Sequence, residues 1–171
     1  GAGYEYSGVI SNVGSAYLTY GINAEDAAAA TSDLFSSFRD FTTLSEAQQE
    51  KIAATTAIMS KFGISGHETA KNLDIATKSL GLNVTEAEVL IRDFEAIAKS
   101  VGKPISEISA DFASAAPQIA FYGKQAIDVF KQLEAQSKST GLSVDQLIGT
   151  FGEQFDTFEG SAQAVGRLNA L

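Results

Sequence analysis

The sequence contains no cysteine and no tryptophan, and it has a single histidine, a single methionine and two prolines. Without cysteine the chain forms no disulfide and offers no thiolate ligand, and one histidine cannot form a His-His metal pair. His67 follows Gly66 at a predicted helix start, which indicates an exposed residue in the first turn. We therefore predict no cofactor and no metal site within this chain.

Basic residues are also scarce. Among 171 residues, 12 Lys and Arg face 21 Asp and Glu, which gives a net charge of -9. Such a charge opposes contact with a phosphate backbone, and the stretch 142–163 carries no Lys or Arg that could serve a recognition helix. We expect no sequence-specific contact with nucleic acid.

No secretory signal is recognisable, because no basic segment precedes a short apolar run. The longest uncharged stretch, 6–24, approaches the length of a membrane span but contains several Gly, Ser and Asn residues, so we interpret it as an arm. Residues 1–22 mix Gly and Ser with Tyr and lack a period of 3.6 residues. The sequence predicts a flexible or extended, non-helical arm over 1–22.

From residue 23 onward the pattern becomes helical. Helix starts are marked by capping residues followed three positions later by an acid or amide, and helix ends by glycine. Pro117 is expected to break the fifth helix. We predict an all-α fold, an irregular bundle of seven or eight short helices over 23–171, cut at its C-terminal end. The predicted caps are Asn23, Ser45, Ser65, Thr85 (with Glu88), Ser106, Ser143 and Asp156.

A Lys-Ser-x-Gly turn recurs at Gly81, Gly102 and Gly141, with a looser copy at Gly63. Lysine near a helix C-terminus is favoured by the helix dipole, and glycine adopts the left-handed conformation that closes the helix. The spacing suggests a helical solenoid, but the apolar stripes differ between copies. We favour a compact bundle and retain the solenoid as the alternative.

Catalytic patterns are weak. The acid pairs Asp93 with Glu95 and Glu153 with Asp156 are explained by solvated helix surface, so we predict that the chain is not an enzyme. The arm tyrosines and one phenylalanine that follows a predicted cap are the candidate partner contacts. These residues are Tyr4, Tyr6, Tyr17, Tyr20 and Phe158.

Several segments in the second half carry a family resemblance: Asp111 to Gly123, Val129-Phe130, Gln136 to Leu142, Glu153 to Gly160 and Ala164 to Ala170. Over residues 80–171 the chain resembles the tail tape measure proteins of bacteriophages. The first 60 residues resemble that family poorly, and the chain lacks the long uninterrupted helical repeat typical of it.

The resemblance implies a virion structural protein whose length sets tail length and which is ejected ahead of the genome at infection. Its implied partners are other copies of itself, tail tube and tail tip proteins or an assembly chaperone, with envelope contact during ejection. The implied location is the tail lumen of the virion, and the host cytoplasm during assembly.

Two other classes stay open at this point. A helical adaptor or effector module would bind a protein partner through the tyrosine-rich arm and exposed aromatics, without catalysis. A peptidoglycan hydrolase is the third class, because tape measure proteins can carry such domains, although we find no catalytic acid-and-metal set in these residues.

Overall fold

The computed structural model describes residues 5–155, with side chains described as far as residue 150. Helices occupy most of this range, and the described residues contain no strand. In chain order the elements are α2 Ser7–Ala16, η1 Leu18–Tyr20, α3 Ala24–Ser37, η2 Phe41–Thr43, α4 Glu46–Lys61, α5 Gly66–Lys78, α6 Val84–Val101, α7 Ile105–Ala115, η3 Ala120–Gln125, α8 Ala126–Thr140 and α9 Val144–Phe155.

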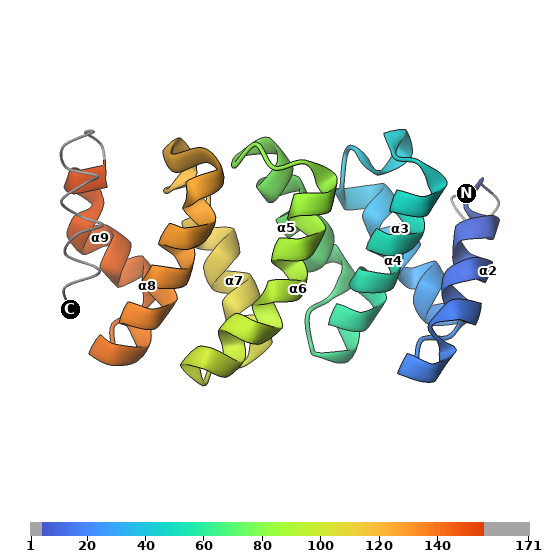
Figure 1. Cartoon of the computed structure of the whole chain (residues 1–171), viewed down its shortest axis with the longest axis horizontal. Coiled ribbons are helices and arrows are strands. Elements are labelled where there is room, and N and C mark those ends of the chain that lie inside the picture. Colours follow the sequence, from blue (N-terminus) through green and yellow to red (C-terminus); the bar gives the residue numbers. More distant parts are fainter. Residues whose placement is uncertain (1–4, 156–171) are drawn as a thin grey trace.

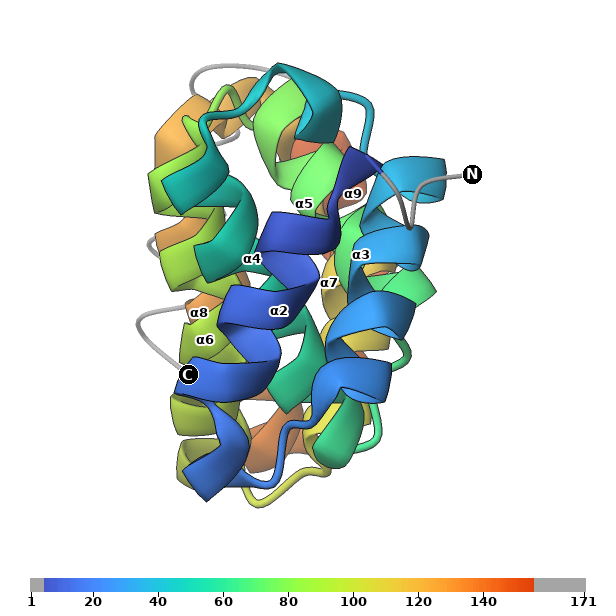
Figure 2. The ribbon, with the colours of Figure 1, turned by 90° about the vertical axis from the view of Figure 1, so that its right-hand side faces the viewer.

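The helices form two rows along one long axis. Figure 1 shows them side by side, and Figure 2 separates α2, α4, α6 and α8 (the even row) from α3, α5, α7 and α9 (the odd row). Each helix packs against its neighbours in sequence and against the next helix of its own row. The predicted all-α bundle is confirmed, and its stacked helix pairs give it the solenoid arrangement that the glycine spacing raised as the alternative.

The stack repeats with nearly constant register. Gly63, Gly102 and Gly141 follow one another at 39 residues, and each lies in the left-handed region after an even-row helix. Counted from the first residue of α3, α5 and α7, the positions seven, ten and fourteen residues further on are all buried, although their residue types differ. The last of each set lies beyond the helix end. These positions are Thr31, Leu34 and Phe38 for α3, Leu73, Ala76 and Leu80 for α5, and Phe112, Ala115 and Ile119 for α7.

Capping chemistry sets most of the helix starts. Asn23, Ser45 and Ser65 each accept a hydrogen bond from the backbone three residues on, as predicted. Ser143 and Gln146 also form such a box at α9. Two predicted caps are wrong: α6 is capped by Asn83 with Glu86 rather than by Thr85, and α7 begins at Ile105, ahead of Ser106.

The prediction of a non-helical arm is corrected for residues 7–16, because these residues form α2. Val9 and Val13 are buried in the common core, so an apolar face exists within this Gly- and Ser-rich segment. Gly14 lets α2 approach α3 closely: a Cβ at this position would lie 2.9 Å from the Cα of Ala24. The segment is helical because tertiary packing outweighs its weak intrinsic preference.

The core is continuous along the stack, and three aromatic rings meet in it between α6, α7 and α8. Phe94, Phe112 and Phe130 are fully buried there, and their ring centroids lie 5.4, 5.5 and 6.4 Å apart. Their tilted and edge-on packing is the arrangement that aromatic quadrupoles favour. Each row therefore presents one face to this core and the opposite face to solvent.

Candidate functional site

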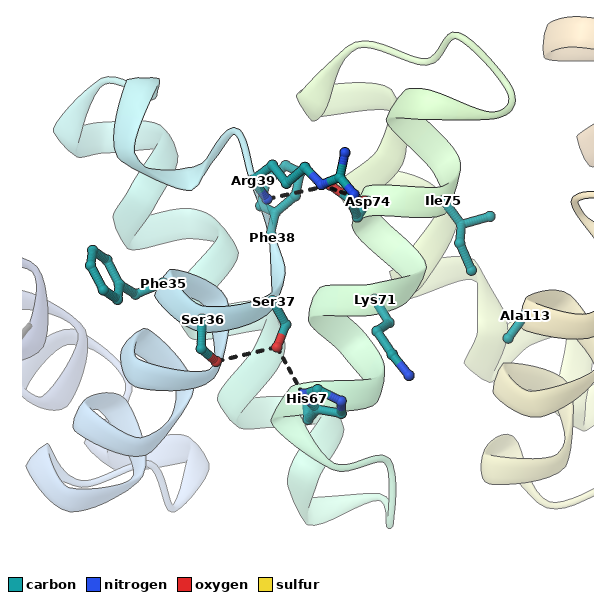
Figure 3. A pocket seen from close by; sticks show the side chains of 10 residues that line it. All are labelled: Phe35, Ser36, Ser37, Phe38, Arg39, His67, Lys71, Asp74, Ile75 and Ala113. Carbon is teal, nitrogen blue, oxygen red and sulfur yellow. Dashed lines mark hydrogen bonds and ion pairs between the residues drawn. The ribbon is translucent and has the colours of Figure 1, made fainter.

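An open groove lies on the outer face of the odd row and encloses about 730 Å³. Figure 3 shows Ser36 and Ser37 of α3 on one side, His67 and Lys71 of α5 in the middle, and Ala113 of α7 beyond them. We call it the Lys71 groove. Its lining is completed by Phe35, Phe38, Arg39, Asp74 and Ile75.

Hydrogen bonds join α3 to α5 along one wall of the groove. Ser37 Oγ lies 2.8 Å from His67 Nδ1, and Ser36 Oγ lies 3.2 Å from Ser37 Oγ. The backbone N–H of Arg39 donates to Asp74 Oδ1 at 3.3 Å, and the Arg39 Nε lies 4.0 Å from Asp74 Oδ2. These contacts fix α3 against α5 and keep the wall in place.

A second hollow continues the groove between α5 and α7. It encloses about 410 Å³, and Lys71 and Ala113 line both hollows. Asn72, buried below Lys71, donates from Nδ2 to Ser109 Oγ at 2.8 Å and so fixes α5 against α7. The two hollows thus form one depression across three successive odd-row helices, with polar and apolar side chains in its lining.

The Ser37 hydroxyl and the His67 ring form one part of a nucleophile and base pair, in which a third group orients the imidazole. Within residues 5–150 no carboxylate contacts the His67 ring, which is exposed in the first turn of α5 as predicted. The Ser36 hydroxyl donates to the Asp33 carbonyl at 3.0 Å, and the Ser37 hydroxyl is bonded to Ser36 and His67. The Lys71 ammonium is therefore the donor that this part of the groove offers to an anionic group.

Two glutamates are buried in the stack, and the sequence did not distinguish them from surface acids. Glu88, predicted as a capping partner, is 2% exposed, because the cap lies two residues earlier. Arg92 Nε lies 2.7 Å from its Oε1, Lys51 Nζ lies 3.3 Å from its Oε2, and Thr55 donates to Oε1 at 2.8 Å. Glu88 thereby links α4 to α6.

Glu134 of α8 is fully buried, and its Oε2 lies 2.9 Å from Lys103 Nζ. Lys103 also contacts Asp111 Oδ2 at 2.9 Å and Glu107 Oε1 at 3.3 Å. Burial raises the pKa of Glu134, the Lys103 ammonium lowers it and the Asp111 carboxylate raises it, with a net value of about 7. Glu134 is the fully buried member of this cluster, and through Lys103 it links α8 to the start of α7.

The predicted partner contacts are distributed unevenly. The prediction that Tyr6 contacts a partner is corrected. Tyr6 is 5% exposed and its ring centroid lies 5.3 Å from that of Phe41, so it belongs to the core. Tyr17 is half-buried, with its ring 6.0 Å from that of Tyr20, which is 71% exposed. Tyr4 and Phe158 lie outside the described residues.

Within residues 5–155, no group of three or more His, Cys, Asp or Glu side chains is arranged to hold a metal ion. The same part of the chain contains no helix with the length and apolarity needed to cross a membrane. Comparison of the chain with protein-family models, with curated proteins and with solved structures gives no match.

Proposed function

We propose that this chain is a non-catalytic structural segment of a bacteriophage tail tape measure protein. The proposal rests on the resemblance over residues 80–171 and is supported by the repeated helix pair. Because each pair adds a nearly constant increment along one axis, chain length converts directly into physical length in such a stack. In this role the segment lies in the tail lumen, contacts tube or tip proteins, and leaves ahead of the genome.

Purified virions of the phage that carries the parent gene provide the test. Mass spectrometry should detect peptides of this segment in the tail, and their absence from virions would overturn the proposal. Deleting residues 84–122, which removes α6, α7 and most of the connection to α8, then separates two roles. Shorter tails in electron micrographs support a measuring role, and tails of unchanged length with the segment present support a docking role at the tip.

A helical adaptor or effector module is the second candidate function, and one observation favours it. The Lys71 groove gives the outer face of the odd row a hollowed surface with polar and apolar side chains. An adaptor would bind its partner there without catalysis. Recovery of a stable complex with a protein that is not part of the virion would favour this candidate over the tail role.

A further inference from the structure

Lys71 differs from every other basic residue in the described part of the chain. The ten other described Lys and Arg side chains each lie within 4.0 Å of a carboxylate or donate to a backbone carbonyl. Lys71 has neither kind of partner within residues 5–150, and it lies on an exposed face of a chain whose net charge is -9. An unpaired ammonium on an acidic protein is a charge left available for another molecule.

The repeat register explains why the surface around Lys71 is hollow. Lys71 is the sixth residue of α5, and the sixth residues of α3, α7 and α9 are Ala29, Ala110 and Gly149. All of them are exposed and small. The one long side chain at this position is therefore flanked along the row by helices that leave space beside it. Figure 3 shows Lys71 and Ile75 extending from α5 toward the side on which Ala113 lies.

The rest of the groove offers further groups to a ligand. Arg39 is exposed at one end, the hydroxyls of Ser36 and Ser37 lie along the α3 wall, and Ile75 is half-buried in the lining. Adjacent helices in a row pack about 8–10 Å apart, so three helices present a track of about 20 Å, which an extended peptide of about six residues would cover.

We infer that the Lys71 groove binds an extended acidic segment of a protein partner. A carboxylate of the segment pairs with the Lys71 ammonium, and apolar side chains of the segment rest on Ile75 and Ala113. Charge complementarity selects the acidic segment over a basic one, because the two acids that line the hollows, Asp74 and Glu68, already accept hydrogen bonds within the chain. The inference stands apart from the tape measure proposal, because it requires only the groove and its charge.

The test uses the whole chain and a fluorescein-labelled peptide of alternating Glu and Leu, about six residues long. Fluorescence anisotropy should show salt-sensitive binding of this peptide and none of the corresponding Lys and Leu peptide. Lys71→Glu should weaken binding about tenfold and Lys71→Ala about threefold. Lys99→Glu is the matched control, because Lys99 is an exposed lysine on α6 of the even row and the substitution changes the net charge equally.

Circular dichroism of each variant checks that the fold is intact, which is expected because Lys71 has no partner to lose. Equal weakening by Lys99→Glu would mean that only net charge matters and would overturn the inference. Failure of the acidic peptide to bind would overturn it as well. Lys71-dependent binding of vesicles rich in phosphatidylglycerol, in place of the peptide, would assign the groove to a membrane surface and reject the protein partner.

Discussion

Lys131 of α8 lies 3.3 Å from Asp93 of α6, although 38 residues separate them in the chain. Lys124 lies 2.8 Å from Glu86 and Lys138 donates to the carbonyl of Ser100 at 2.9 Å, with the same separation in each case. Successive pairs are seven residues apart in each of the two segments. Seven residues are close to two helical turns, so the pairs lie on one face. These pairs show that α6 and α8 run in the same direction and in register.

This ladder predicts a small, specific effect of charge. Lys131→Glu should lower the free energy of unfolding by about 0.5 kcal/mol, because it places like charges beside each other on an exposed surface. The exchange Asp93→Lys with Lys131→Glu should restore most of that loss. Urea denaturation measures both, and Lys71→Glu, which breaks no ion pair among residues 5–150, is the control with the same change in net charge. Failure of the exchange to recover stability would contradict the proposed register.

The buried Glu134 predicts that stability falls as pH rises toward neutrality. Its pKa is raised to about 7 in the folded chain, mainly by burial, so the folded state binds the proton more tightly than the unfolded state. Glu134 therefore contributes most below the unfolded pKa of about 4.3, and the contribution is lost as pH rises through about 7. The loss should be on the order of 1–3 kcal/mol.

Denaturation between about pH 5 and pH 8 measures this effect, with Glu134→Gln as the key variant. The amide does not titrate, so this variant should lose the stability change over that range, whereas Glu95→Gln on the surface of α6 should retain it. Asp26 and Glu86 act in the opposite direction. Hydrogen bonds to these carboxylates, from the Asn23 backbone and from Lys124 respectively, lower their pKa values, so their stabilisation is lost only at more acidic pH.

Two glycines in helices should respond to alanine with opposite signs. Gly14→Ala should destabilise the fold by about 1–3 kcal/mol, because the new methyl group would press on the backbone of Ala24. Gly149→Ala should stabilise it by about 0.5–1 kcal/mol, since nothing lies within 4 Å and alanine favours the helix. Thermal unfolding compares the two variants. Equal effects would contradict the close packing of α2 on α3.

The start of α6 can be tested directly. Asn83→Ala should cost about 1 kcal/mol, because the side chain of Asn83 accepts the backbone N–H of Glu86. Thr85→Ala should change stability by less than about 0.5 kcal/mol, since Thr85 is exposed within the first turn. Chemical denaturation of both variants decides between them. A larger effect at Thr85 would support the cap position expected from the sequence.

The sequence by itself determined the helical class, most helix starts and the glycine ends, because capping boxes and left-handed glycines act within a few residues. It also placed His67 correctly in an exposed first turn. It failed for α2, whose Gly- and Ser-rich composition conceals an apolar face, and it placed Tyr6 on the surface when the fold buries it. A comparison of equivalent helix positions would have identified Lys71, since alanine or glycine occupies the corresponding sites.

Only the tertiary structure decided which acidic residues are buried and which exposed residues line the groove. Glu88 and Glu134 look like any helix-surface acid in sequence, and their burial depends on partners from other helices, such as Lys51 and Lys103. The two rows and the groove likewise arise from contacts between residues 30 to 38 positions apart, as between Ser37 and His67 or Lys131 and Asp93. Local chemistry specifies each helix, whereas packing between helices fixes their register and, in the described part of the chain, leaves Lys71 without a partner.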